Sequence, residues 1–314
     1  MSEKPPPLSE WDRRWEYVTR VFLIFLALLL GLAAGCSCAG GKADAAAPVR
    51  VSYLGPEGTY TQEACETFFG EKVSLLPYPA AAGAVGALLS DEADFAVIPQ
   101  ENTIGGAVND YLDLVIGNRD VSVAGEVELP ISQNLLVLPG TSLGDIKTVY
   151  SHPQAIAQSE EWRKEHLPDA RVIEVSSTAE GASVVAKSGD RTCAAVASAG
   201  CAPLYGLEIL ARDIQNSDSN RTRFYVLTLK APGEQKADRF AFVAVGNAKD
   251  LPALMKKIQN RKITLIAIHD RPRKTGLGEY RYLIECEGGY RDYRKLVKGL
   301  DAFEFRYLGS FSVR

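Results

Sequence analysis

From Val49 onward, short apolar runs alternate with amphipathic stretches, and the changes between them carry a glycine or a helix-capping residue. This alternation predicts an α/β fold in which strands lead into helices. We expect strands over 49–54, 94–99 and 146–150. The helices that follow them are expected from Thr59 toward Phe69, from Ala107 to Ile116, after Pro153, and from Ser177 to about Lys187.

Capping residues mark the expected helix starts. Thr59 with Gln62, and Ser177 with Glu180, have the spacing of capping boxes, and His152 or Ser151 suits a cap before Pro153. In open α/β sheets, ligands bind at the carboxyl ends of strands, where helix N-termini present free N–H groups. The pattern therefore indicates a site for an anion. The nearby Gly55-x-x-Gly58 lacks the Gly-Lys-Ser/Thr ending of a nucleotide-phosphate loop, so we interpret these glycines as turn formers.

A second unit follows a stretch rich in Lys, Gly and Glu at 230–238. Its pattern predicts a strand at 239–246, a helix at 251–261, strands at 263–270 and 279–288, a helix at 290–300 and a strand at 302–311. This βαββαβ order is ferredoxin-like. We expect the charged run 270–274 to form a solvated loop between two strands, with ligand contact as the alternative.

An apolar leader precedes both units. Residues 21–41 carry no charge, and Arg13, Arg14 and Arg20 come before them, which places the N-terminus inside and the body outside. Acylation at Cys36, cleavage near 45–47 and retention as a membrane anchor stay open, as does the alternative of a cytoplasmic body. We divide the chain into a targeting segment at 1–48, a catalytic domain at 49–230 and a C-terminal domain at 239–314.

Composition narrows the choice of partners. The 35 basic and 39 acidic residues give a net charge of −4, without a basic run, so nucleic acid is not expected as a partner. The three histidines are scattered and no Cys-x-x-Cys pair occurs, so we predict no metal. Cys65, Cys193, Cys201 and Cys286 are expected to be buried thiols. A Cys193–Cys201 disulfide is the alternative for an exported body.

Several short strings stand in the order and spacing found in one enzyme family. They are Gly55-Pro-Glu-Gly-Thr-Tyr60, Pro99-Gln-Glu-Asn-Thr103, Ser151-His-Pro-Gln-Ala-Ile-Ala-Gln158, Ser177-Thr178, Tyr205-Gly-Leu207 and Asn220-Arg-Thr-Arg-Phe224. From Val49 to Arg314, the chain resembles the prephenate dehydratases. The resemblance implies a catalytic domain of two α/β lobes, similar to periplasmic binding proteins, with the active site between the lobes. It also implies a C-terminal ACT domain that binds phenylalanine.

The resemblance implies a reaction and a set of residues. Prephenate would lose carbon dioxide and its ring hydroxyl together, giving phenylpyruvate, with no cofactor. Thr222 would hydrogen-bond the leaving hydroxyl, Arg223 would neutralise a substrate carboxylate, and Phe224 completes the catalytic string. The residues expected to bind substrate, several of them at helix starts, are Thr59, Tyr60, Asn102, Thr103, Gln154, Ser177 and Thr178. Capping alone would also explain Thr59, Thr103, Ser151 and Ser177, and Phe224 is most simply a core residue.

The chain departs from the family pattern at several positions. Gly105 stands where the family commonly has a glutamate, and Gln133 stands where it usually has a histidine. In the second unit, Pro252-Ala253-Leu254 replaces Gly-Ala-Leu, and His269-Asp270-Arg271-Pro272 replaces Glu-Ser-Arg-Pro. The regulatory residues retained by this matching are Ala253, Leu254, Arg271 and Pro272, which would serve a phenylalanine effector.

Other functions remain compatible with the sequence. Arogenate could replace prephenate, because no residue here distinguishes the amine from the keto group. An exported solute-binding protein for an aromatic or dicarboxylate anion would suit the leader, and a degenerate dehydratase could persist as an amino-acid sensor. We expect a homodimer or a homotetramer.

Overall fold

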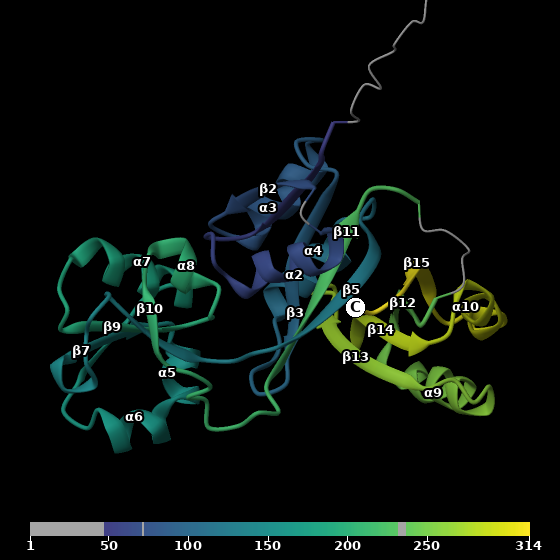
Figure 1. Cartoon of the computed structure of the whole chain (residues 1–314). Helices are drawn as coiled ribbons and strands as arrows, with labels where there is room; N and C mark the ends of the chain where they lie inside the picture. The colour runs from purple at the N-terminus through teal and green to yellow at the C-terminus, as the bar shows by residue number, and fades with distance from the viewer. Residues whose placement is uncertain (1–46, 71, 232–236) are drawn as a thin grey trace, which may run out of the picture. The chain divides into compact units, whose positions relative to one another are not determined.

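The computed structural model describes residues 47–70, 72–231 and 237–314 (Figure 1). The predicted leader at 21–41, including Cys36, lies outside these ranges. Within them, no helix has both the length and the apolar character needed to cross a membrane. Residues Pro48–Arg314 form one compact unit. The boundary at 230–238 therefore stays a prediction.

The first lobe is built on a sheet with the strand order β2-β1-β3-β11-β5, and a short β4 pairs with β3. Its strands are β1 (Val49–Leu54), β2 (Val73–Tyr78), β3 (Phe95–Asn102), β4 (Gly106–Ala107), β5 (Ser122–Pro130) and β11 (Arg221–Thr228). Its helices are α2 (Tyr60–Phe69), α3 (Ala81–Leu89) and α4 (Asn109–Gly117). Strand β11 lies between β3 and β5 and is antiparallel to both. The predicted strand at 49–54 is confirmed.

The second lobe is inserted between β5 and β11. Its sheet has the order β10-β6-β9-β7-β8. The strands are β6 (Asn134–Val137), β7 (Thr148–Ser151), β8 (Arg171–Glu174), β9 (Cys193–Ala197) and β10 (Glu208–Ala211). The helices are α5 (Pro153–Gln158), α6 (Glu160–His166), α7 (Thr178–Ser188) and α8 (Cys201–Tyr205). Because the chain leaves the first lobe after β5 and re-enters it with β11, both crossings lie at the boundary between the lobes (Figure 1).

The helix caps confirm part of the sequence prediction. His152 caps α5, since its Nδ1 accepts a hydrogen bond from the Gln154 N–H at 3.2 Å. Ser177 caps α7 by accepting from the Glu180 N–H at 3.0 Å. The predicted box at Thr59 is wrong in detail, because the Gln62 side chain accepts from the Gly58 N–H instead.

Asn102 and Thr103, two of the expected substrate-binding residues, do not lie at a helix start. Strand β3 continues to Asn102, and α4 begins only at Asn109. A register shift in the pairing with β11 leaves Gln100 unmatched, with Pro99 beside it. Prolines within sheets are found at bulges and edges, because a proline has no N–H to donate to the ladder.

The C-terminal unit has the predicted βαββαβ order. Its elements are β12 (Arg239–Asn247), α9 (Leu251–Asn260), β13 (Leu265–Pro272), β14 (Glu279–Glu287), α10 (Tyr290–Val297) and β15 (Glu304–Phe311). The strands form an antiparallel sheet in the order β13-β14-β12-β15, as in ferredoxin-like folds. The expected loop at 270–274 is shorter than predicted, since β13 runs to Pro272.

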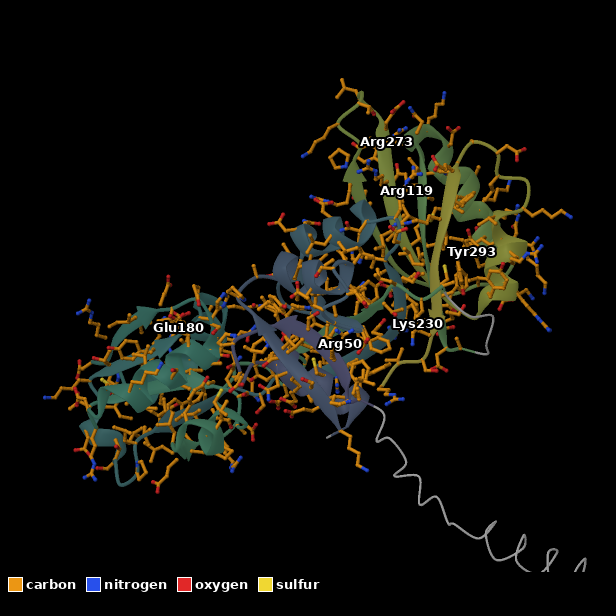
Figure 2. All side chains as sticks on the ribbon, turned by 90° about the horizontal axis from the view of Figure 1, so that it is seen from above. Arg50, Arg119, Glu180, Lys230, Arg273 and Tyr293 are labelled. Atoms are coloured by element: carbon orange, nitrogen blue, oxygen red, sulfur yellow. The ribbon has the colours of Figure 1, made fainter. Side chains whose placement is uncertain are left out.

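Both faces of this sheet are covered. Phe240 and Phe242 of β12 pack on one side with residues of α9 and α10, including Tyr293, which is labelled in Figure 2. On the other side, Leu283 and Phe311 share a buried core with Tyr225 and other residues of the first lobe. The C-terminal unit thus packs on the face of the first-lobe sheet to which Tyr225 of β11 contributes.

Polar contacts supplement this shared core. Arg271 pairs with Asp113 of α4 through two hydrogen bonds of 2.7 and 2.8 Å. Hydrogen bonding to Arg271 lowers the pKa of the Asp113 carboxyl. Arg119, labelled in Figure 2, lies 3.7 Å from Glu304. The four cysteines at 65, 193, 201 and 286 are buried free thiols, as predicted, and the alternative Cys193–Cys201 disulfide is not formed.

Candidate active site

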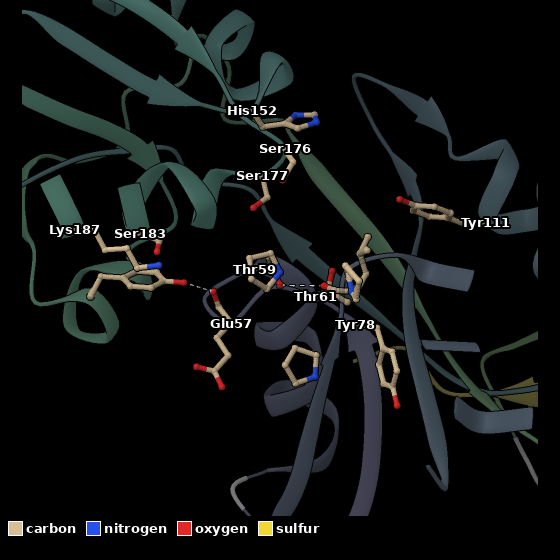
Figure 3. A pocket seen from close by; sticks show the side chains of 16 residues that line it. Glu57, Thr59, Thr61, Tyr78, Tyr111, His152, Ser176, Ser177, Ser183 and Lys187 are labelled. Carbon is tan, nitrogen blue, oxygen red and sulfur yellow. Dashed lines mark hydrogen bonds between the residues drawn. The ribbon is translucent and has the colours of Figure 1, made fainter. Parts of the chain in front are cut away.

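Two adjoining cavities of about 770 and 190 Å³ lie between the lobes. They share a wall made of residues from both lobes, which are Thr59, Thr61, His152, Ser176 and Ser177. Figure 3 shows the larger cavity, with Thr59 and Thr61 on one side and Ser176, Ser177 and His152 on the other. The smaller cavity is lined by Asn102, Gln154, Thr178, Thr222 and Phe224 as well. We call the two together the interlobe cleft.

A pair of neutral side chains on neighbouring strands lies at the smaller cavity. Thr222 of β11 is paired in register with Asn102 of β3, and the Asn102 amide donates a hydrogen bond of 2.8 Å to the Thr222 hydroxyl oxygen. The same amide nitrogen donates its second proton to the side-chain oxygen Oδ1 of Asn220, also at 2.8 Å. Asn102 therefore has no further proton to donate.

The orientation of the Asn102 amide is fixed from the other side. Its carbonyl oxygen accepts from the backbone N–H groups of Ile104 and Gly105 at 3.0 and 2.9 Å. Gln154, which comes from the second lobe, donates to the same oxygen at 3.1 Å. A flipped amide would lose all three bonds. The observed orientation is thus the one that local backbone donors require.

Gly105 explains one departure from the family pattern. A Cβ atom at this position would lie 2.9 Å from the Gln154 Nε2 atom. A side chain here would therefore displace the amide that joins the two lobes. The absence of the usual glutamate leaves space for the Gln154–Asn102 contact.

A chain of amides continues from Asn102 into the protein. The Asn220 amide donates to the side-chain oxygen Oε1 of Gln158 at 3.0 Å, and the Gln133 amide donates to the same oxygen at 3.2 Å. The donor and the acceptor of each hydrogen bond in this chain are fixed, because the Asn102 amide at its end has only one favourable orientation. The Thr222 hydroxyl accepts from this chain and makes no donor bond to any other group in the described ranges, so its own proton is free for a ligand in the cleft.

The remaining predicted substrate-binding residues are distributed unevenly. Ser177 and Thr178 line the cleft at the start of α7, where the helix presents N–H groups. Tyr60 lines the smaller cavity, and its hydroxyl donates to the Ser132 carbonyl oxygen at 2.5 Å. The Thr59 hydroxyl donates to the Leu54 carbonyl oxygen at 3.2 Å.

Thr103 and Phe224 differ from the other predicted residues. Thr103 is exposed in the turn after β3 and bonds to the Ser219 carbonyl oxygen at 3.1 Å, away from the cleft lining. Phe224 borders the smaller cavity but belongs to the buried core of the first lobe. Its packing supports the wall behind Thr222.

Arg223 lies on the opposite face of β11 from Thr222. Its guanidinium binds both oxygens of Glu126 at 2.8 Å and lies 3.0 Å from Glu101, and it also contacts Glu285. It does not line either cavity of the cleft. Burial lowers the pKa of Arg223, but Glu126 and Glu285 together raise it above its ordinary value, so the guanidinium stays charged. Its expected contact with a substrate carboxylate is therefore not formed from this position.

Other cleft residues were missed by the sequence analysis. The larger cavity is also lined by Lys187, Ser176, Ser183, Tyr111 and Tyr205, of which Figure 3 labels the first four. Lys187 lies in the last turn of α7, nine positions after Thr178, and is a cation on the cleft wall. Ser176 and Ser183 are seven positions apart, and Ser183 and Lys187 are four apart. This spacing could have indicated that they lie on one side of a helix. Burial lowers the pKa of His152, the histidine of this wall.

The fold and the cleft together define a class of protein. They describe a two-lobed α/β enzyme domain in which a hydroxyl donor faces an interlobe cavity, with a ferredoxin-like unit behind it. Residues 51–232 match the family model described as prephenate dehydratase. The chain belongs to the prephenate dehydratase family.

Relatives agree with this assignment. The bifunctional chorismate mutase/prephenate dehydratase of Neisseria gonorrhoeae is 36% identical over 247 residues, covering 78% of this chain and 68% of that protein. The prephenate dehydratase of Lactococcus lactis is 33% identical over 276 residues, covering 84% of this chain and 98% of that one. The crystal structure of prephenate dehydratase from Arthrobacter aurescens in complex with L-Phe has a TM-score of 0.77 at 29% identity, covering 84% and 90%.

Proposed function

We propose that this chain is a lyase that converts prephenate to phenylpyruvate in phenylalanine biosynthesis, with Thr222 as the group that meets the leaving hydroxyl. The observation that carries the proposal is the Asn102–Thr222 hydrogen bond of 2.8 Å at the cleft wall. It occupies the Thr222 oxygen as an acceptor and leaves the hydroxyl proton for the substrate.

The reaction needs little beyond such a donor. The bond between the ring and its carboxylate breaks, and its electron pair forms the third double bond of the benzene ring as carbon dioxide departs. The ring C–O bond breaks at the same time, and the leaving hydroxide takes one proton to become water. Formation of the aromatic ring drives both bond cleavages. The protein therefore has to orient the substrate and assist a poor leaving group, which requires no electron transfer and no cofactor.

Thr222 acts as a hydrogen-bond donor to the developing hydroxide. An alcohol is too weak an acid to surrender its proton outright, so solvent supplies the proton that ends in the product water. Placed donors of this kind contribute about 100-fold or more to rates. The uncharged amides behind Thr222 add no negative charge beside a dianionic substrate.

The two substrate carboxylates would bind on the α7 side of the cleft. Ser177 and Thr178 supply hydroxyl groups there, and α7 directs the positive end of its dipole at the same place. Lys187 lines the larger cavity and supplies a positive charge. Arg223 does not take this role, because its guanidinium already pairs with carboxylates of the protein.

The test is an assay on the purified full-length chain. We expect prephenate to give phenylpyruvate, measured by the absorbance of its enol in alkali, without added metal or nucleotide. Arogenate is assayed in parallel, and a higher kcat/KM for arogenate would reassign the substrate. Tight prephenate binding without turnover of either compound would identify a binding protein instead.

We also propose that residues 239–314 are an ACT domain for a phenylalanine effector, following residues 49–230 as the catalytic domain. The predicted regulatory residues stand on two elements: Ala253 and Leu254 on α9, and Arg271 and Pro272 at the end of β13. Arg271 pairs with Asp113 of the first lobe, so a ligand that engaged Arg271 would compete with this contact. Activity measured at saturating phenylalanine, with mass determination of the proposed homodimer or homotetramer, tests both ideas.

The same sequence supports a proposal about location. The uncharged stretch at 21–41 behind three arginines would tether the body to a membrane or export it. Fractionation of cells that express the full-length chain tests this, and Cys36→Ala distinguishes acylation from cleavage. Recovery of the unprocessed chain from the cytoplasm alone would contradict it.

A further inference from the structure

A fully buried carboxylate joins the C-terminal unit to the strand that carries Thr222. Glu285 lies in β14, and its Oε2 atom accepts a hydrogen bond from the Arg223 guanidinium. Arg223 also binds Glu126 of β5 and Glu101 of β3. Among these three acidic partners of Arg223, Glu285 alone comes from the C-terminal unit.

The second carboxylate oxygen of Glu285 bonds to side chains of β11 and β3, the strands that carry Thr222 and Asn102. Its Oε1 atom accepts from the Tyr225 hydroxyl and from the Gln100 amide. Gln100 lies two residues before Asn102, and Tyr225 lies three residues after Thr222. Burial and the charge of Glu285 raise the pKa of Tyr225 well above its ordinary value, so the phenol keeps the proton that it donates.

The cluster is weak evidence for a gain in stability, because desolvation opposes the attraction between buried charges. Arg223 and Arg239 contribute two positive charges, while Glu101, Glu126 and Glu285 contribute three negative ones, so the group carries a net charge of −1. Burying such charges costs free energy that well-packed apolar side chains would not require. What an apolar cluster could not provide is a directional bond from each charged group to a particular strand.

We propose that Glu285 is a positioning residue for the reaction at Thr222. From the C-terminal unit, it holds Arg223, Tyr225 and Gln100, and so fixes where β11 and β3 present Thr222 and Asn102 to the cleft. The C-terminal unit thereby helps to hold the strands that carry Thr222 and Asn102 in place. The proposal rests on the dehydratase activity proposed above, and it adds a requirement that the activity alone does not impose.

The first test compares Glu285→Gln with Glu287→Gln in the full-length chain. Glu287 lies on the same strand but is exposed, which makes it a matched control. We expect Glu285→Gln to lower kcat about 10-fold with KM for prephenate within about 2-fold, because a small misplacement of a reacting group costs rate while the cleft lining is unchanged. Both variants are assayed at a temperature at which circular dichroism shows them folded. A lower Tm with unchanged kcat would overturn the proposal.

The second test asks whether Glu285 acts through Arg223. In an Arg223→Lys background, which loses the bidentate contact with Glu126, the effect of Glu285→Gln on kcat should shrink to less than about 3-fold, since coupled residues are not additive. The same 10-fold loss in both backgrounds would contradict the route through Arg223.

Hydrogen exchange separates this proposal from the proposed function. Peptides that contain β11 should exchange faster in Glu285→Gln than in Glu287→Gln, whatever the substrate of the protein. A wild-type chain inactive on prephenate and arogenate refutes the dehydratase function. Unchanged exchange of β11 refutes the positioning by Glu285, even if the wild type is active.

Discussion

The two faces of strand β11 have opposite chemistry. On the cleft face, the Asn102 amide donates to both the Thr222 hydroxyl and the Asn220 side chain, and all three groups are uncharged. On the face toward the C-terminal unit, Arg223 meets carboxylates from three different strands. A neutral donor can approach a dianionic substrate without repulsion, whereas fixed charges behind it hold the strand. Successive residues of one strand can therefore take a chemical task and a structural task, because their side chains point to opposite faces.

The charged face should respond most strongly in stability. Arg223→Met leaves the buried Glu285 without a cation and the buried Glu126 with Arg239 alone, so we expect the free energy of unfolding to fall by about 3–5 kcal/mol. Arg221→Met is the matched control on the same strand. Arg221 is half exposed and lies 3.6 Å from Glu128, so its loss should cost less than about 1 kcal/mol.

Urea denaturation followed by circular dichroism measures both changes. If Arg223→Met cannot be purified, Arg223→Lys keeps the charge and loses only the bidentate geometry, and it should still be less stable than the Arg221 variant. Equal stability of the Arg221 and Arg223 variants would remove the distinction between the two faces.

The neutral face should respond in rate. Thr222→Ala removes the donor and is expected to lower kcat at least about 100-fold, with the free energy of unfolding changed by less than about 1 kcal/mol. Thr222→Ser keeps the hydroxyl and should recover most of the rate. Thr228→Ala, a buried threonine at the far end of β11, serves as the control for loss of a methyl group and a hydroxyl.

Steady-state assays on these three variants decide the role of Thr222. Near-normal turnover in Thr222→Ala would remove it from the mechanism. An equal loss of kcat in Thr222→Ala and Thr228→Ala would mean that any change in β11 lowers the rate. The loss in Thr222→Ala would then not show that the Thr222 hydroxyl takes part in the chemistry.

The contrast between the faces also shows what the sequence could reveal. Local patterns predicted the βαββαβ order and the caps at His152 and Ser177, because these depend on residues close together in the chain. The alternation of side chains along a strand could have placed Thr222 and Arg223 on opposite faces, since adjacent residues on a strand do not face the same cavity. The resemblance covers Thr222, Arg223 and Phe224 as one string, and it therefore implies a substrate contact for Arg223 that the strand geometry does not allow.

The partners of Arg223 were beyond local reasoning. Glu285 lies 62 residues further along the chain and in a different unit, so only the packing of two sheets brings it to β11. One signal was present, since an acidic residue interrupts the apolar run from Tyr282 to Cys286. A buried acid in a strand needs a partner, although the sequence does not tell which one. Likewise, the extension of β3 to Asn102 depends on a bulge that forms only against β11.

The smallest expected effect concerns His152, the titratable group that joins the cleft wall to a helix cap. Its Nδ1 accepts the Gln154 N–H, and this is possible only for the neutral imidazole, because both ring nitrogens carry protons in the cation. Burial lowers the pKa of His152 below its ordinary 6.5. The unfolded chain therefore binds the proton more tightly than the folded chain. The cap contributes its full stability above about pH 6.5, and this contribution is lost as the pH falls through the lower pKa of His152 in the folded state.

Because His152 is half-buried and water screens it, the loss should stay below about 1 kcal/mol, within the range of a helix cap. Thermal unfolding of the full-length chain at a series of pH values from about 5 to 8 measures it. His152→Asn supplies a cap that does not titrate, so the Tm of this variant should fall less on acidification than that of the wild type. His166→Asn, at an exposed position on α6, should follow the wild type. Identical pH profiles for all three proteins would show that acid acts on the charged face of β11 or elsewhere, and that the neutral wall of the cleft is insensitive to it.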